Sequence, residues 1–339
     1  MNGNANHTYS DTAILSVVAV EAPEVVTSAQ FDERLAATYE RLGTQPGLLD
    51  NLAGIRERRW WPESVSFAEA AAAAGQKAIA EAGIDRSRIG LLINTSVCRD
   101  HLEPSAAVAI HHMLDLPSSC LNFDLLNACL GFLNAIQVAG SIIDGGQLDY
   151  ALIVDGEGSR RTQEATLARL ASAQATISDL FAEFATLTCG SGAAAMVLGR
   201  HSENPGSHRV VGGVSHADTS YHDACVGTLD GMRTDTKLLL DGGLLLAKRA
   251  WAEVSDEGWR NMDRYILHQV SQVHTSMMCE VLGIDPAKVP LTYPTLGNVG
   301  PASVPITLAL EADSLQAGDR VLLLGIGSGI NAMATEIVW

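Results

Sequence analysis

The sequence predicts an α/β fold, on two observations. Short apolar segments alternate with helix-like segments along the chain, and the arrangement of the first part recurs in the second. Alternating strands and helices pack most readily as sheets covered by helices. The chain has 339 residues, of which 47% are apolar and 18% charged. This length and composition suit one large domain or two fused halves with ample core.

Apolar runs, small residues and capping signals predict the elements of the first part. An alanine-rich helix is predicted over residues 66–82, because Ser66 and Glu69 have capping-box spacing. A helix rich in small residues is predicted over 130–143, after the apolar segment 121–126. The other predicted elements are strands over residues 12–20, 89–94, 149–155 and 193–199, and a helix over 105–114.

The second part repeats this order. Residues 127–155 contain a small-residue helix, a glycine turn at Gly146 and an apolar strand, and residues 298–325 contain the same series around Gly318. Two copies imply pseudo-twofold symmetry, with equivalent strand ends meeting where α/β folds place ligands. We predict an N-terminal half over residues 1–200 and a C-terminal half over 201–339. The elements predicted in the second part are strands over 209–214, 265–268 and 320–325, and a helix over 270–282.

Residues 160–188 do not fit the repeat. Their apolar residues recur at helical spacing, which predicts an amphipathic helical excursion. Two interpretations stay open: a surface helix packed on the core, and a lid over an apolar channel. The charged residues before and within this segment are interpreted as a loop ion cluster, with a substrate contact as the alternative: Asp155, Glu157, Arg160 and Arg161.

Charge and cysteine usage exclude several classes of protein. The net charge of −17 leaves no basic footprint for nucleic acid, and no apolar run reaches the roughly 18 residues of a transmembrane helix. The polar start of the chain does not resemble a secretory signal. The six cysteines are scattered without CxxC spacing, so we expect neither a zinc site nor a disulfide framework. These features predict a reduced, cytoplasmic protein that binds no metal.

The segment 127–132 places Cys129 at the start of the predicted helix. A thiol there faces free backbone N–H groups and the positive end of the helix dipole, both of which favour the nucleophilic thiolate. A buried free cysteine acting as a small hydrophobe is an equally good explanation of this segment alone.

Three further segments place polar groups in apolar, glycine-rich surroundings. His268 follows a strand, Asn298 begins a helix, and a glycine-rich turn spans residues 325–329. Each alone has a plain structural explanation: a core histidine, an N-cap, a tight turn. Their equivalent positions in the repeat, beside Cys129, instead favour thioester chemistry. Cys129 would carry an acyl group, backbone N–H groups of Cys129 and Ser328 would form an oxyanion hole, and His268 and Asn298 would stabilise an enolate.

On these segments the chain resembles the thiolase superfamily, and within it the ketoacyl synthase III branch, over its whole length. The resemblance implies a five-layered αβαβα fold of two similar halves, the first carrying Cys129 and the second His268 and Asn298. It further implies a homodimer and Claisen condensation of thioester substrates, with no cofactor. The matching segments are residues 54–59, 127–132, 268–269, 297–305 and 325–329.

Two departures from the priming synthases concern the substrates. Residues 45–53 lack the Trp and Arg that clamp the adenine of coenzyme A in those enzymes, which leaves Arg56, Arg58 and Arg59 as candidate phosphate contacts. The loop 97–105 carries Glu103 where they have an aromatic residue. In this the chain resembles the OleA family, in which the corresponding glutamate enters from the partner subunit as a base. A solvated loop charge or a helix-start acid is the alternative for Glu103.

The OleA resemblance implies head-to-head, non-decarboxylative condensation of two long-chain acyl-CoAs to a 2-alkyl-3-ketoacyl product for olefin biosynthesis. Removing an α-proton requires a base, whereas decarboxylative condensation does not. The acidic chain favours free CoA thioesters over acidic carrier proteins. Partners are then a second copy of the chain, acyl-CoA and downstream pathway enzymes. The alternatives are a malonyl-dependent synthase or acyltransferase and a non-catalytic partner that retains the fold for dimerisation.

Overall fold

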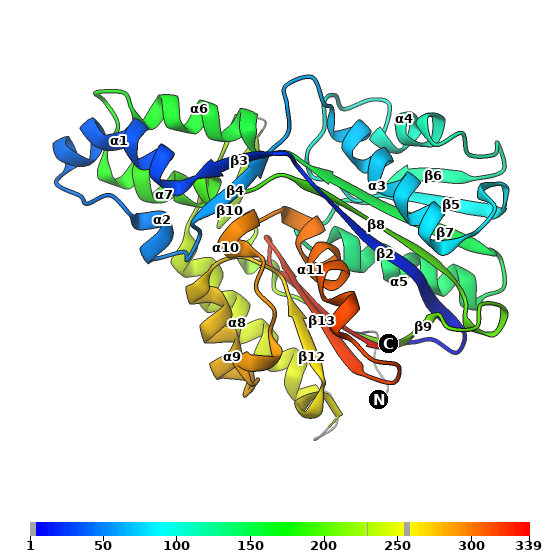
Figure 1. Ribbon diagram of the computed structural model, residues 1–339. Helices are drawn as coiled ribbons and strands as arrows, with labels where there is room; N and C mark the ends of the chain where they lie inside the picture. Colours follow the sequence, from blue (N-terminus) through cyan, green and yellow to red (C-terminus); the bar gives the residue numbers. More distant parts are fainter. Residues whose placement is uncertain (1–4, 229, 254–257) are drawn as a thin grey trace.

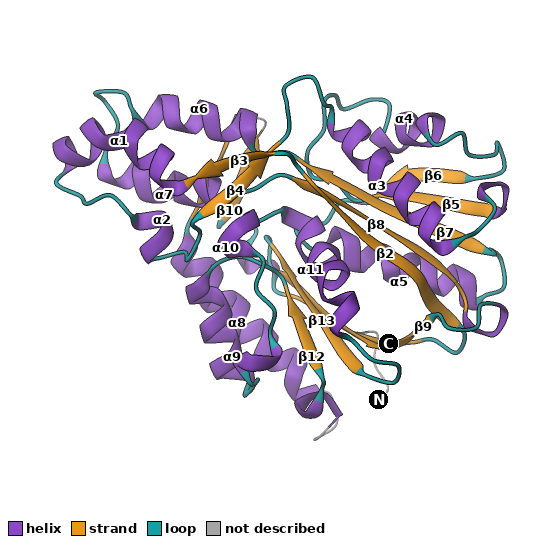
Figure 2. Cartoon of the chain, in the orientation of Figure 1, coloured by secondary structure: helices purple, strands orange, loops and turns teal. Residues whose placement is uncertain are grey.

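A computed structural model describes residues 5–228, 230–253 and 258–339 (Figures 1 and 2). Hydrogen bonding joins ten strands into one sheet, in the order β12-β13-β14-β9-β2-β8-β7-β5-β6, with β1 beside β9. The strands are β1 (Asn6–Thr8), β2 (Thr12–Glu21), β5 (Ile89–Asn94), β6 (Leu121–Asp124), β7 (Tyr150–Glu157), β8 (Gly192–Arg200), β9 (His208–Ala217), β12 (Arg264–Leu267), β13 (Arg320–Gly327) and β14 (Asn331–Val338).

The pairing pattern of this sheet repeats. In the first half β2 pairs antiparallel with β8, β8 antiparallel with β7, and β7 parallel with β5. In the second half β9 pairs antiparallel with β14, β14 antiparallel with β13, and β13 parallel with β12. The halves join where β2 pairs with β9 at Ala13–Arg209 and Ile14–His208. The internal repeat inferred from the sequence is therefore present in the strand pairing.

The two halves of the sheet form two layers, and helices form the other three. Helix α3 (Phe67–Ala82) covers the outer face of the first half, together with α4 (Ala106–Met113). Helices α8 (Thr236–Glu253) and α9 (Gln272–Leu282) cover the outer face of the second half. Helices α5 (Gly131–Asp144) and α11 (Ser303–Glu311) lie between the two halves. The result is the α/β fold with five αβαβα layers.

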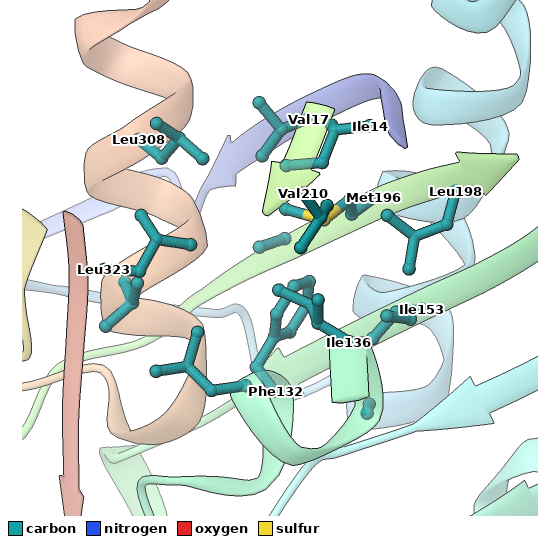
Figure 3. Packing of buried hydrophobic residues seen from close by; sticks show 14 of the residues in the cluster. Ile14, Val17, Phe132, Ile136, Ile153, Met196, Leu198, Val210, Leu308 and Leu323 are labelled. Atoms are coloured by element: carbon teal, nitrogen blue, oxygen red, sulfur yellow. The ribbon is translucent and has the colours of Figure 1, made fainter. Parts of the chain in front are cut away.

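The central core lies around α5 and α11 (Figure 3). Phe132 and Ile136 of α5 and Leu308 of α11 pack among strand residues of both halves, including Ile14 and Leu323. All five side chains are at most 1% exposed. Burial of this size contributes about 1.5–3 kcal/mol per large side chain, so the central helices fix the two halves relative to one another.

Residues outside the repeat form a helical layer at one end of the molecule (Figure 1). The predicted excursion is two helices, α6 (Arg160–Leu170) and α7 (Ile177–Thr188), which pack together and share a core with α1 (Ser28–Leu42). The sequence did not predict α1, the four-residue α2 (Leu48–Asn51) or the short pairs β3 (Glu24–Thr27) with β4 (Glu57–Trp60) and β10 (Cys225–Thr228) with β11 (Gly231–Thr234).

The capping prediction for α3 is confirmed. The Ser66 hydroxyl accepts a hydrogen bond from the Glu69 N–H, and the Glu69 carboxylate accepts one from the Ser66 N–H. None of the helices in the described ranges combines the length and apolar character needed to cross a bilayer.

Candidate active site

Cys129 lies in a strained turn immediately before α5. Ala128 has φ 46, a left-handed conformation that costs a non-glycine residue about 1–2 kcal/mol. Helix α5 begins at Gly131 with no side chain capping its N–H groups. Burial raises the pKa of the Cys129 thiol well above its usual range, and Cys189 and Glu157 raise it further. The helix start favours the thiolate, but burial is the largest cause of the shift and the net effect favours the thiol.

His268 directly follows β12. Its backbone N–H donates to the carbonyl oxygen of Leu324 at 2.8 Å, and its side chain is 2% exposed. Burial, with a smaller contribution from His274, lowers the pKa of His268 to about 3. The imidazole is therefore neutral near pH 7 and retains one N–H to donate.

Asn298 lies in the turn between α10 (Tyr293–Leu296) and the 3-10 helix η6 (Gly300–Ala302). Its backbone N–H donates to the Thr188 carbonyl and its own carbonyl accepts from the Gly190 N–H, both at 2.9 Å. Its side-chain oxygen accepts from the Gly300 N–H at 3.0 Å. With the amide oxygen engaged, the NH₂ group is the part of Asn298 left to act on a ligand.

The glycine-rich turn between β13 and β14 packs against the Cys129 segment. A Cβ added at Gly327 would lie 2.9 Å from the Asn127 carbonyl oxygen and 3.3 Å from the Leu130 nitrogen. The amide of Asn331 donates to the side-chain oxygen of Asn127 at 3.1 Å. Only glycine permits this approach, which places the turn containing Ser328 beside the backbone of Cys129.

Contacts of this turn and of Cys189 connect the three predicted catalytic residues. His268 lies beside Gly325, because Leu267 and Leu324 are paired in the parallel β12–β13 ladder. Cys189 forms a β-bridge with Asn298. Among the ionisable groups near Cys129, Cys189 raises the pKa of the Cys129 thiol most. The segments of the cysteine, the histidine and the asparagine thus adjoin one another: Cys129 comes after β6, His268 follows β12, and Asn298 lies in the turn before η6.

A cavity of about 30 Å³ lies on the outer side of His268, beneath α8 and α9. At this size it holds a water molecule, not an acyl chain. His274 of α9 also lines it, and burial lowers the pKa of His274 to about 4. The remaining lining is mostly apolar and does not include Cys129 or Asn298: Ala247, Ala250, Trp251, Trp259, Leu267, Met278, Leu282, Leu324, Gly325, Ile326, Ala332, Met333 and Ala334.

Glu103 lies on the surface of the single chain. It is exposed, on the loop 97–105 between β5 and α4, and its neighbour Leu102 is 87% exposed. The helix after this loop, α4, packs against β6, the strand at the edge of the sheet. In the described part of the chain, Glu103 forms no hydrogen bond or ion pair with Cys129, His268 or Asn298.

Comparison with known proteins places this site in a family. The models for 3-oxoacyl-[acyl-carrier-protein] synthase III and for its C-terminal part match residues 123–218 and 255–339. An acyl-CoA:acyl-CoA alkyltransferase from Xanthomonas campestris is 43% identical over 98% of this chain and 99% of its own. One from Shewanella oneidensis is 36% identical over the same shares. The chain belongs to the OleA family.

Solved OleA structures agree with this assignment. A histidine variant of X. campestris OleA superposes with a TM-score of 0.96 at 42% identity, covering 98% of this chain and 99% of that chain. A cysteine variant with bound lauric acid and lauroyl-CoA gives a TM-score of 0.95 at 42% identity, covering 98% and 100%. The thiolase-like fold inferred from the sequence is thereby confirmed.

The three arginines of this OleA-family chain have different environments. Arg56 is exposed. Arg59 is half-buried and faces the Glu57 carboxylate at 3.2 Å. Arg58 is fully buried, with its guanidinium 4.6 Å from the Phe31 ring centroid, and burial lowers its pKa to about 10. The prediction of a phosphate contact by Arg58 is therefore corrected: the side chain is part of the core.

Two acids were assigned to a loop and lie in the sheet instead. Asp155 and Glu157 are in β7, 0% and 6% exposed. The ion-cluster interpretation holds only for the arginines, since Arg160 pairs with Glu24 and Arg161 with Asp230. The spacing of the two acids could have indicated this. Residues two apart at the end of an apolar strand face the same side of the sheet if the strand continues through them.

Proposed function

We propose that this chain is an acyl-CoA:acyl-CoA alkyltransferase. It joins two long-chain acyl-CoAs head to head by non-decarboxylative Claisen condensation, giving a 2-alkyl-3-ketoacyl product. The observation that carries the proposal is the full-length, 43% identical match to the X. campestris alkyltransferase. The neutral, buried His268 beside the Gly325 turn supports it.

The first step is acyl transfer to Cys129. The thiol sulfur attacks the thioester carbonyl, a sulfur–carbon bond forms, and coenzyme A leaves carrying the proton that Cys129 loses. The oxyanion of the tetrahedral intermediate takes hydrogen bonds from the backbone N–H groups of Cys129 and Ser328. Close packing of Gly327 on Asn127 supports this pairing of donors.

The second step makes the carbon–carbon bond. A base removes an α-proton from the second acyl-CoA, and the enolate oxygen takes hydrogen bonds from His268 and the Asn298 amide. Both donors are neutral, so they stabilise the enolate without protonating it fully. The enolate carbon then attacks the acyl group on Cys129, and the Cys129 sulfur leaves.

Glu103 of a second copy of the chain is the proposed base. A homodimer through the β6 edge would carry the exposed loop 97–105 toward the neighbouring site. An unpaired edge strand surrounded by exposed apolar side chains is typical of an association surface. Apolar residues exposed on and near this edge are Leu102, Val108, Met113, Leu121 and Leu126.

The remaining assignments follow the same reaction. The substrates are CoA thioesters and no cofactor takes part; Arg56 is the proposed phosphate contact among the three arginines, because it alone is exposed. Hydrolysis would release a β-keto acid for the next enzymes of olefin biosynthesis. A cytoplasmic location and the division into halves at residue 200 stay predictions.

Purified protein incubated with myristoyl-CoA alone tests the proposal. After heating, which removes CO₂ from a β-keto acid, gas chromatography should detect a symmetrical long-chain ketone. Cys129→Ala is the matched control and should form none. Absence of ketone from the wild-type protein, with ketoacyl product appearing only when a malonyl thioester is added, would replace this proposal by the decarboxylative synthase.

A further inference from the structure

Asp155 and Glu157 form a buried carboxyl pair near Cys129. They lie two residues apart in β7, so their side chains leave the same face of the sheet. They are 0% and 6% exposed, and within the described ranges neither forms an ion pair with a cationic side chain. Two buried carboxyl groups without a cation at ion-pair distance are costly, which calls for a reason beyond packing.

Hydrogen bonds place this pair beside the start of α5. The Thr95 hydroxyl donates to Asp155 Oδ2 at 2.5 Å, while Asp155 Oδ1 has no partner in the described part of the chain. A Cβ added at Gly131, the first residue of α5, would lie 3.4 Å from the Thr95 side chain. Thr95 therefore separates Asp155 from the helix start that presents Cys129.

Glu157 also contacts the Asn298 turn. A Cβ at Gly300 would lie 3.5 Å from Glu157 Cδ and 3.8 Å from Oε2, and the Gly300 N–H donates to Asn298. On its other side, Glu157 Oε1 accepts from the Val97 N–H at 2.5 Å. The pair thus lies between the Cys129 segment, the Asn298 turn and the loop that carries Glu103.

Two buried carboxyl groups so close cannot both be ionised at moderate pH. Burial raises the pKa of Glu157 to about 7, and burial together with Glu157 holds the pKa of Asp155 well above its usual range. The other ionisable groups facing Glu157 are Cys98, Arg99, Cys129 and Cys189. Of these only Arg99 favours the charged form of Glu157 by its own charge.

We propose that the Asp155–Glu157 pair controls the ionisation of Cys129. While both carboxyl groups are protonated, the thiol loses its proton beside neutral groups. Once Glu157 is ionised, a thiolate at Cys129 forms beside an anion and is disfavoured. Glu157 contacts no reacting atom in this scheme. It affects the reaction only through the effect of its charge on Cys129. The inference rests on the proposed role of Cys129 as nucleophile.

The rate of Cys129 alkylation by iodoacetamide, followed by peptide mass spectrometry from pH 6 to 9, tests the proposal. For an isolated thiol below its pKa, the rate rises tenfold per pH unit. The wild-type rate should rise less than tenfold per pH unit just above pH 7, because the neutral-thiol form with ionised Glu157 and the thiolate form with protonated Glu157 contain the same number of protons.

Glu157→Gln should restore the steady rise. Its rate should match wild type at pH 6, where Glu157 is protonated, and exceed it by about tenfold near pH 8.5 if the charge shifts the thiol by one pKa unit. The exposed Glu81→Gln on α3 is the matched control and should follow wild type. A Glu157→Gln to wild-type ratio that is constant over pH contradicts the proposal, since a purely structural role predicts no pH-dependent ratio.

A measurement on the wild-type protein covers the case in which the variant does not fold. At pH 6 ordinary carboxyl groups are ionised, so infrared difference spectra should retain a protonated-carboxyl band from this pair. No such band at pH 6 overturns the proposal. Neither experiment uses acyl-CoA. If both contradict this proposal, the condensation assay still tests the proposed function independently.

Discussion

The backbone N–H of His268 donates to the carbonyl oxygen of Leu324 at 2.8 Å, one residue before the glycine turn begins. This bond extends the β12–β13 ladder past the end of β12 and fixes the imidazole beside Gly325. Because the ring is buried and neutral, its role in the proposed reaction is to donate a hydrogen bond rather than to exchange a proton.

Replacing His268 should separate the two chemical steps. His268→Ala removes one enolate donor, so ketone formation from myristoyl-CoA should fall by about 10²–10³-fold. Acylation of Cys129 should persist, because the oxyanion hole is built from backbone groups. Intact mass spectrometry measures the acyl adduct and gas chromatography the ketone. Loss of the adduct as well would assign His268 to acyl transfer instead.

The location of the base can be tested with mixed dimers. Cys129→Ala and Glu103→Gln proteins should each be inactive in condensation. If Glu103 serves the partner's site, mixing and reassociating the two should restore about a quarter of wild-type activity, since half of the dimers are mixed and each has one complete site. A Glu103 acting within its own chain predicts no recovery, because each chain then lacks one of the two groups.

The glycine turn should tolerate no side chain at its closest approach. Gly327→Ala places a Cβ 2.9 Å from the Asn127 carbonyl, so the turn must shift and the oxyanion donors separate. Acylation of Cys129 should slow by about tenfold or more. Gly227→Ala, where the added Cβ meets nothing within 4 Å, is the control and should acylate at the wild-type rate. Equal rates for both variants would remove the turn from the oxyanion hole.

The buried histidines should make the fold sensitive to acid. Burial lowers the pKa of His268 to about 3 and of His274 to about 4, from an ordinary value of 6.5. Between the lowered folded-state pKa values and 6.5, the unfolded chain binds more protons than the folded chain. The free energy of unfolding should therefore fall as the pH drops below about 6.5. Denaturant titrations at pH 7 and pH 5 should show a smaller loss for His274→Gln than for wild type; an unchanged loss contradicts its burial as the neutral form.

Glu157 should act in the opposite direction. Its folded-state pKa is raised to about 7 from 4.5, so it contributes stability at low pH that is lost as the pH rises through about 7. In the same titrations, Glu157→Gln should remove this contribution and steepen the loss of stability on acidification. A Glu157→Gln protein with the wild-type pH dependence would mean that Glu157 titrates normally.

Local sequence signals were sufficient for much of the fold and of the site. The capping box at Ser66 predicted the start of α3, and the apolar run 89–94 predicted β5 with its observed bounds. Cys129, His268 and Asn298 were found because each follows a strand or begins a helix in a repeated pattern. Each of these residues alone is a weak indication of a site, and their recurrence in the repeat made the prediction specific. In the structure, the glycine turn lies beside the segments that carry them.

What the sequence could not predict depends on distant partners. The sequence makes Arg58 a candidate phosphate contact, because nothing local indicates that its guanidinium packs on Phe31 and donates to Ser28. The sequence groups Asp155 and Glu157 with Arg160 and Arg161 as a loop ion cluster, because nothing local indicates that β7 continues to Glu157. The direction of the Cys129 pKa shift also depends on burial by residues far along the chain, which outweighs the local helix start.

Carbon-labelled substrate tests the central claim most directly. Myristoyl-CoA carrying ¹³C at its carbonyl carbon is supplied as the only thioester. Head-to-head condensation followed by loss of CO₂ predicts a ketone with one label, at its carbonyl carbon, and release of the second label as ¹³CO₂. No labelled ketone from active, Cys129-acylated protein would contradict the account.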